Sequence, residues 1–523
     1  MHRFFKAIIK WTLRLMVLLG LLLGILMLLF PLPQLDSNRS VSEALSQEDI
    51  LQTHWGRVLS EDQAQHPHLS GVYFLQSPET AFAARGKMAQ EAEKTLDIQY
   101  YIWKKDTTGL LLLQAAYQAA ERGVRVRLLL DDNGTKGLDA ELMALDAHPN
   151  IEVRLFNPFV FRRFKALGFV TDFSRANRRM HNKSFTADNV VTVVGGRNIA
   201  DEYFGATNEV VFADLDAIVI GEVVKDVSES FDDYWRSQSA YPIAQIVKPN
   251  SSLQQAALNA LLNHHQQHNS TQYLQAIGQL KSVSSLLHNN HQVHWVPAQF
   301  IADVPEKGLG SVPKHQLLLH DMAQTLGESK KSLDVVSPYF VPTKEGTDYF
   351  INLTKQGVQV RIITNSMAAT DVLPVHSGYA KYRKQLIKAG VQLYEMKPDP
   401  SSSQFAEQLG LIGSSGSSLH AKTFSSDQLR FFVGSFNFDP RSANLNTELG
   451  IVIDDAQIAA QMNELFEHKI HATSWQVHYD AANEQLQWHD VQNNTVLTQE
   501  PHSTAWQRGI LKVLSWLPIE PLL

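Results

Sequence analysis

A histidine and a lysine stand two residues apart at the start of the stretch from His181 to Asn198, which reads HNKSFTADNVVTVVGGRN. Side chains at positions i and i+2 of a strand point to the same face, so His181 and Lys183 would present an imidazole and an ammonium group side by side. Gly195 and Gly196 let the backbone approach a bound group closely, and Asn198 adds a neutral amide donor. A nucleophile or proton carrier, a fixed positive charge and a neutral donor together suit a phosphate group.

The same pattern recurs further along the chain. From His420 to Asn437 the sequence reads HAKTFSSDQLRFFVGSFN, with His, Lys, Asp, Gly and Asn at the same offsets. A single pair of this kind is common by chance, but a pattern of this length matched twice is an internal repeat. It predicts one catalytic set in each half: His181, Lys183, Asp188 and Asn198 in the first, and His420, Lys422, Asp427, Ser435 and Asn437 in the second.

Two such sets, brought to one cleft by a pseudo-two-fold axis, would place two histidines on opposite sides of a phosphodiester. One imidazole would attack phosphorus while the other, protonated, gives its proton to the leaving oxygen. The lysines would neutralise the non-bridging oxygens, so this chemistry needs neither a metal ion nor another cofactor. Asp188 and Asp427 follow the turn out of the strand, where they could hold the hairpin together without touching substrate. We expect the phosphate to be bound by Asn198, Ser435 and Asn437.

Two glutamates lie at matching distances from the histidines. Glu209 follows His181 by 28 residues, and Glu448 follows His420 by 28 residues. A carboxylate bonded to the far ring nitrogen fixes the tautomer of an imidazole and stabilises the imidazolium. We therefore predict that Glu209 and Glu448 orient the histidines.

The elements that position these motifs also repeat. Short apolar runs rich in β-branched residues or leucine follow helical stretches, which is typical of helices handing over to buried parallel strands. Each half reads strand, helix, strand, helix, strand and then the His-Lys hairpin, which is an α/β unit. The matching pairs are KTLDIQYYIW from Lys94 and KSLDVVSPYF from Lys331, RGVRVRLLL from Arg122 and QGVQVRIIT from Gln356, and IEVRLFN from Ile151 and VQLYEMK from Val391.

The N-terminus predicts a retained membrane anchor. Four basic residues (Arg3, Lys6, Lys10 and Arg14) precede an apolar run over 15–32, which is long enough to cross a bilayer and lacks a small-x-small cleavage pattern. The positive flank predicts a cytoplasmic N-terminus and catalytic domains on the far side of the membrane. The predicted limits are an anchor over 1–35, a first domain over 36–245, a polar His- and Gln-rich linker or helical connection over 246–295, a second domain over 296–490 and an amphipathic tail over 491–523.

The composition excludes several classes of function. The 523 residues are 44% apolar, which is typical of a globular protein, and the absence of cysteine excludes disulfides, thiolate nucleophiles and zinc ribbons. The net charge of −7 gives no general attraction to nucleic acid. We therefore expect no nucleic-acid partner.

The duplicated HxKxxxxDxxxxxxG(G/S)xN pattern resembles the phospholipase D superfamily, and within it the bacterial cardiolipin synthases. The likeness rests on LDIQYYIW, RRMHNKSFTADN, GGRNIADEYFGA and VFADLD in the first half and on SPYFVPT, LHAKTF and GSFNFDPRSANLNTELG in the second. It implies an α/β fold of two tandem domains, each a mixed sheet flanked by helices, that form one shared active site behind an N-terminal transmembrane helix. It also implies a phosphohistidine intermediate and no metal. Gly196 stands where many members have serine, so the two halves are not expected to be equivalent.

The resemblance implies a transfer of a phosphatidyl group from phosphatidylglycerol or phosphatidylethanolamine to a second phosphatidylglycerol. It implies His181 as the nucleophile, His420 as the general acid and base, and a place in the bacterial inner membrane with the catalytic domains on the periplasmic side. A phospholipase D that releases phosphatidic acid and a membrane-tethered phosphodiesterase or nuclease are the alternatives, and spacing alone does not separate transferase from hydrolase. A co-expressed protein partner is left open.

Two further segments could meet the membrane. The residues before His181 interleave phenylalanines with arginine and lysine, a composition that suits an interface of anionic headgroups and acyl chains as well as it suits a core. The tail from Ala505, AWQRGILKVLSWLPIEPLL, could lie in the interface or dock on the domain as a helix.

Overall fold

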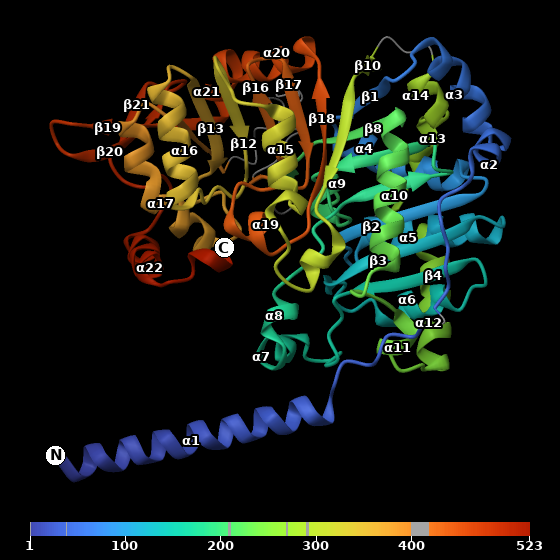
Figure 1. Cartoon of the computed structure of the whole chain (residues 1–523), viewed down its shortest axis with the longest axis horizontal. Helices are drawn as coiled ribbons and strands as arrows, with labels where there is room; N and C mark the ends of the chain where they lie inside the picture. Colours follow the sequence, from blue (N-terminus) through green and yellow to red (C-terminus); the bar gives the residue numbers. More distant parts are fainter. Residues whose placement is uncertain (1, 38, 208–210, 268–269, 289–291, 399–417) are drawn as a thin grey trace.

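The computed structural model describes residues 2–37, 39–207, 211–267, 270–288, 292–398 and 418–523. It contains two large mixed sheets lying side by side, each with helices on its faces, and an N-terminal helix that extends away from both (Figure 1). This helix, α1 (His2–Leu29), is long and apolar enough over Phe4–Leu29 to cross a membrane.

The first sheet has nine strands. In spatial order they are β10 (His294–Val296), β1 (Ser70–Leu75), β8 (Asp216–Gly221), β6 (Val191–Gly195), β5 (Ser184–Ala187), β2 (Thr95–Ile102), β3 (Arg125–Gly134), β4 (Ile151–Phe156) and β9 (Ala240–Pro242).

The second sheet has ten strands. In spatial order they are β11 (Ala298–Ala302), β18 (Leu449–Asp454), β17 (Arg430–Gly434), β16 (Thr423–Ser426), β12 (Ser332–Val336), β13 (Gln359–Asn365), β14 (Gln392–Met396), β19 (Ser474–Asp480), β20 (Gln485–Asp490) and β21 (Thr495–Leu497).

From β1 to β9 and from β11 to β19 the two orders match strand by strand. In each, three central strands run parallel, namely β2, β3 and β4 or β12, β13 and β14. The hairpin that carries the His-Lys motif pairs antiparallel beside them. The structure thus realises the duplicated α/β unit that the sequence predicts.

Helices cover the faces of both sheets, and several begin at a polar cap. Ser77 caps α4, Asp106 caps α5 and Asp455 caps α20 by accepting a backbone hydrogen bond from the first turn. The first half contains α2 (Gln47–Gln52), α3 (His54–Gln65), α4 (Pro78–Glu91), α5 (Thr107–Glu121), α6 (Asp139–Asp146), α7 (Gly168–Thr171), α8 (Phe173–Ala176), α9 (Asp201–Phe204), α10 (Glu222–Arg236) and α11 (Ile243–Ile246). The second contains α15 (Leu318–Leu326), α16 (Thr343–Lys355), α17 (Leu373–Lys388), α19 (Pro440–Asn444), α20 (Ala456–Glu464), α21 (Ile470–Thr473) and α22 (Ala505–Trp516).

The stretch expected to be a linker or helical connection forms helices that pack on the first half. These are α12 (Ser251–Leu262), α13 (Thr271–Gln279) and α14 (Val283–Leu287), and α12 contacts α6 while α13 contacts α4. The chain passes from the first sheet to the second at Pro297, between β10 and β11.

Each sheet buries one matched ion pair. Asp97 of β2 holds Arg127 of β3 through two hydrogen bonds of 2.7 and 2.8 Å, and Asp334 of β12 holds Arg361 of β13 with the same two lengths. All four residues are at most 1% exposed. Buried charges need such pairing, so the arginine on the neighbouring strand explains why each half has a buried aspartate, Asp97 or Asp334, at this position.

The two sheets share a hydrophobic core. Val194 and Val219 of the first sheet belong to one buried cluster with Val433 and Ile451 of the second. This shared core fixes the two halves against each other and so fixes the relative positions of their hairpins.

Candidate active site

Each histidine is held in place by the opposite half. The backbone N–H of His181 donates to the carbonyl of Thr447 over 2.9 Å, and that of His420 donates to the carbonyl of Ala213 over 2.7 Å. The short strands β7 (Phe212–Ala213) and β15 (Ser418–Leu419) pair across the boundary in the same way as Met180 pairs with Thr447. The two HxK motifs are therefore brought together at one site between the halves.

The carboxylates that orient the histidines also cross between the halves. Glu448 Oε2 lies 2.8 Å from Nδ1 of His181, and Asp214 Oδ2 lies 2.5 Å from Nδ1 of His420. The offset in the sequence matched Glu448 with His420, and this pairing is wrong, because Glu448 reaches the histidine of the first half. Glu209, expected beside His181, lies outside the described residues.

Asp214 was missed because the repeat is not uniform between the hairpin and the next strand. The first half has five more residues there, since Asp214 follows His181 by 33 residues whereas Glu448 follows His420 by 28. Each acid is followed directly by a leucine. The carbonyl of Leu215 accepts from the N–H of Gly196, and the carbonyl of Leu449 accepts from the N–H of Ser435 at the equivalent position. Alignment on the strands that follow, FADLD against NTELG, would have identified the pair.

The ionisation of these four residues follows from burial and from their neighbours. Burial lowers the pKa of His181 to about 4, although Glu448 opposes the shift, and it also lowers the pKa of His420. Burial alone would raise the pKa of Asp214, but His420 and Lys422 outweigh it and lower the value to about 2. The pKa of Glu448 is lowered likewise, against its burial, by His181 and Lys183. Neutral imidazoles thus face ionised carboxylates through Nδ1. Nε2 of each ring is turned away from its carboxylate, and in His420 it lies 3.3 Å from Lys422 Nζ.

Both lysines are buried at the same site. Lys183 Nζ donates to the carbonyl of His181 and Lys422 Nζ to that of His420. Burial lowers the pKa of Lys183 to about 7 and that of Lys422 to about 8, and the charge of Lys422 adds to the shift of Lys183. The site therefore concentrates positive charge that an anionic phosphate would stabilise.

The three residues expected to bind phosphate differ in their present partners. The Asn198 amide accepts from the N–H of Ile102 over 3.1 Å and donates to the hydroxyl of Tyr203 over 2.9 Å. The hydroxyl of Ser435 donates to Glu448. Asn437 is buried, and its Oδ1 has no hydrogen-bond partner in the part of the chain that the structure describes.

Asp188 and Asp427 lie away from the two histidines, which corrects their grouping with the catalytic residues and agrees with the alternative that they hold the hairpin together. Asp188 Oδ1 accepts from the backbone N–H groups of Lys94 and Thr95 at 2.7 and 2.9 Å, where β2 begins. Asp427 makes the equivalent bonds where β12 begins, at 2.6 Å from the N–H of Lys331. Both have positive φ angles, 50° and 56°, at the first position of the three-residue turn of the hairpin. These carboxylates tie the far end of each hairpin to the neighbouring strand.

Aromatic rings that the sequence analysis did not identify lie beside the histidines. The ring of Tyr101 meets His181 edge-on at 4.9 Å between centroids, and that of Tyr203 meets His420 edge-on at 5.0 Å. Phe212 also contacts His420, at 5.1 Å. These rings do not stand at matching offsets from the two HxK motifs, so the repeat in the sequence does not identify them and only the folded structure does.

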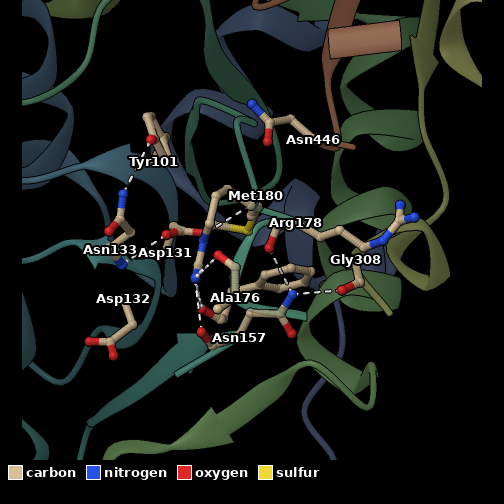
Figure 2. Close-up of polar contacts among 12 residues, drawn as sticks. Tyr101, Asp131, Asp132, Asn133, Asn157, Ala176, Arg178, Met180, Gly308 and Asn446 are labelled. Atoms are coloured by element: carbon tan, nitrogen blue, oxygen red, sulfur yellow. Dashed lines mark hydrogen bonds and ion pairs between the residues drawn. The ribbon is translucent and has the colours of Figure 1, made fainter. Parts of the chain in front are cut away.

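A buried polar network fixes the residues before His181 (Figure 2). The carboxylate of Asp131 accepts from Arg179 Nε over 2.9 Å and from the N–H of Met180 over 2.8 Å. Asn157 donates to the carbonyl of Gly308 over 2.7 Å and so links the first half to the segment after β11 in the second half. Arg179, two residues before His181, thus has a structural role, because it fixes the backbone that leads into the motif.

Comparisons with known proteins agree with this arrangement. The sequence model described as "Cardiolipin synthase, PLD-like domain" matches twice, over 87–235 and 322–470. Cardiolipin synthase C of Escherichia coli (strain K12) is 44% identical over 462 residues, covering 88% of this chain and 98% of the relative. Cardiolipin synthase B of the same strain is 23% identical over 447 residues, covering 86% and 90%.

A solved structure shares the fold. The crystal structure of phosphatidylserine synthase from Haemophilus influenzae Rd KW20 aligns with a TM-score of 0.55 and 15% identity, over 89% of this chain and 100% of that chain. The matches confirm the superfamily and the tandem α/β fold inferred from the repeated motif. The chain therefore belongs to the cardiolipin synthase family of the phospholipase D superfamily.

Proposed function

We propose that this enzyme is a cardiolipin synthase that transfers a phosphatidyl group from phosphatidylglycerol or phosphatidylethanolamine to a hydroxyl of phosphatidylglycerol. The observation that carries the proposal is the crossed pair of imidazole and carboxylate groups, His181 with Glu448 and His420 with Asp214. Two imidazoles of one site, each with Nδ1 engaged, suit a two-step displacement at phosphorus.

In the first step Nε2 of His181 attacks phosphorus and forms a P–N bond. The P–O bond to the headgroup alcohol breaks, and His420, protonated at Nε2, gives its proton to the leaving oxygen. The bound phosphodiester supports that protonation, because its negative charge raises the pKa of nearby bases, and so does the carboxylate of Asp214. Glycerol or ethanolamine is released, and His181 carries the phosphatidyl group.

In the second step the neutral His420 takes the proton of an acceptor hydroxyl as that oxygen attacks phosphorus. The P–N bond breaks, the new phosphodiester leaves and His181 is restored. Lys183 and Lys422 stabilise the charge on the non-bridging oxygens in both steps. Exclusion of water during the second step separates transfer from hydrolysis.

The assignment of His181 as the nucleophile is supported by its low pKa of about 4, which keeps the imidazole neutral at physiological pH. The family resemblance points the same way. Glu448, which accepts a hydrogen bond from Ser435, holds this ring from the opposite half, so Nε2 is presented in one orientation.

The test is a reaction in proteoliposomes that contain labelled phosphatidylglycerol, with and without phosphatidylethanolamine, followed by mass spectrometry of the lipids. Labelled cardiolipin formed by the wild type and lost in His181→Ala supports the proposal, and a rise when phosphatidylethanolamine is present identifies it as a donor. Phosphatidic acid as the main product would make the protein a hydrolase. Activity on a DNA phosphodiester with no lipid product would make it a nuclease.

We also propose that the catalytic domains lie on the periplasmic side of the bacterial inner membrane. The basic residues before the apolar part of α1 support this orientation. A reporter that is active only in the cytoplasm, fused after Leu523, should be inactive, and a cytoplasmic signal would reverse the orientation.

A further inference from the structure

Two segments far apart in the sequence expose apolar side chains on the edge of the molecule nearest α1 (Figure 1). We call residues 163–173 the α7/α8 segment and residues 506–522 the α22 segment. Trp506 and Trp516 are 77% and 72% exposed, and Phe164 is 64% exposed. The other exposed apolar residues of the two segments are Leu167, Val170, Phe173, Val513, Leu517 and Leu522.

Each segment also pairs an exposed aromatic ring with a cation. Arg163 lies over the ring of Phe164 at 5.8 Å, and the Lys512 ammonium lies over Trp516 at 5.9 Å. Aromatic rings with basic groups at their side are typical of segments that lie in the headgroup region of a bilayer with anionic lipids. This local basic character contrasts with the net charge of −7 of the whole chain.

The α7/α8 segment lies where the apolar N-terminal helix ends. Phe30, which follows α1 directly, packs its ring on Phe161 at 5.0 Å between centroids. Helix α1 also contacts α7 directly. A chain anchored by α1 would therefore hold the α7/α8 segment at the membrane surface.

One arginine joins both segments to the active site. Arg441 donates its backbone N–H to the carbonyl of Leu523 over 2.8 Å, beside the end of the α22 segment. Its guanidinium donates to the side-chain oxygen of Asn177, just after α8, over 2.6 Å. A few residues further on, Thr447 accepts the N–H of His181 and Glu448 orients its ring. Arg441 thus ties the chain beside both exposed segments to the short stretch that holds His181.

We propose that the α7/α8 segment and the α22 segment form one membrane-contact face, which lies in the headgroup region of a lipid bilayer and is tied through Arg441 to the stretch that holds His181. The occupant is the bilayer surface itself, with anionic headgroups against Arg163 and Lys512 and the upper acyl chains against the exposed rings. This face goes beyond the proposed transfer reaction, because it concerns where the enzyme meets lipid and does not depend on which lipid is made.

The experiment uses the full chain in proteoliposomes whose lipids carry bromine either near the headgroup or near the end of the acyl chain. The fluorescence of the double variant Trp506→Phe/Trp516→Phe is subtracted from that of the wild type to isolate these two of the nine tryptophans. We expect this difference fluorescence to be quenched severalfold more by bromine near the headgroup. No quenching by either lipid, or stronger quenching from the chain end, would overturn the proposal.

A matched pair of single variants extends the test to the first segment. Phe173→Trp places a reporter on the α7/α8 segment, and Leu429→Trp places one at an exposed site in the β16/β17 turn, at the far end of that hairpin from His420. We expect bromine near the headgroup to quench the added fluorescence of the first variant and not that of the second. Equal behaviour of the two reporters would contradict a membrane-contact face. These readouts need no turnover, so they are independent of the proposed function.

Discussion

In the first half a glycine, Gly196, stands where the second half has Ser435, and the two positions meet different carboxylates. A Cβ atom on Gly196 would come within 2.1 Å of Asp214 Oδ1, so the shorter acid occupies the space that a serine would need. In the second half the hydroxyl of Ser435 donates to the longer Glu448. The halves therefore hold their histidines with the same Nδ1 contact but with different support, which is consistent with different roles for the two rings.

The largest expected effect separates the two histidines. His181→Ala and His420→Ala should each lower the rate of transfer by about 10⁴-fold or more, because each removes a group that acts in the transition state. p-Nitrophenolate is a stable anion that leaves without protonation, so a phosphatidyl ester of p-nitrophenol should restore the first step in His420→Ala but not in His181→Ala. The measurement is release of p-nitrophenolate. Rescue of His181→Ala instead would exchange the two roles.

The next effect concerns the crossed carboxylates. Glu448→Gln and Asp214→Asn should each cost about 10³- to 10⁴-fold in kcat, because an amide favours the wrong tautomer and does not stabilise the imidazolium. The p-nitrophenyl ester should partly rescue Asp214→Asn and leave Glu448→Gln inactive. Glu345→Gln, at an exposed carboxylate on α16, serves as the control and should change little. If the p-nitrophenyl ester instead rescues Glu448→Gln, Glu448 orients the histidine that acts as the general acid and not the nucleophile.

How far the sequence predicts this site can be judged from particular residues. The HxK pairs and the α/β repeats follow from short local patterns, and the structure contains both as expected. The partnership of Glu448 with His181 does not follow, because a carboxylate contributed across the pseudo-two-fold axis has no fixed separation in sequence from its histidine. Asp214 was hidden by five additional residues in one half. Local spacing thus identifies the reacting groups, and only the packing of the halves identifies what orients them.

The difference between Gly196 and Ser435 can be removed by substituting either residue with the one found in the other half. Gly196→Ser should lower kcat about 10²-fold, because the new side chain displaces Asp214 from His420. Ser435→Gly removes one hydrogen bond to Glu448 without a clash, so we expect a loss of about tenfold. Transfer kinetics with the natural leaving group, checked against thermal unfolding of each variant, measures both. A larger loss in Ser435→Gly would mean that the serine contacts the phosphate.

A smaller effect is the pH dependence that the two lysines impose. Because burial lowers the pKa of Lys183 to about 7 and that of Lys422 to about 8, each loses its charge as the pH rises, and kcat/KM should fall above about 7. The acid side should fall only near 4, where His181 becomes protonated. Arginine stays charged, so Lys183→Arg should move the alkaline limit from about 7 to about 8. Lys422→Arg should leave the limit at about 7, and an alkaline limit that neither substitution moves would exclude the lysines as its cause.

The smallest effect on catalysis is expected at the hairpin turns. Asp188→Asn and Asp427→Asn should each change kcat less than about twofold, since both carboxylates bond backbone N–H groups at the far end of the hairpin.

The effects of the two substitutions on stability should differ. Burial raises the pKa of Asp188, so its charged form is disfavoured in the fold and a neutral amide is tolerated there. The pKa of Asp427 is lowered, because backbone donors at Lys331 and Lys330 outweigh its burial, so its charge adds stability that is lost as the pH falls. Thermal unfolding at neutral pH should therefore show a larger decrease for Asp427→Asn than for Asp188→Asn, and the difference should shrink in acid. A large loss of kcat at an unchanged unfolding midpoint would instead show that these aspartates take part in the reaction.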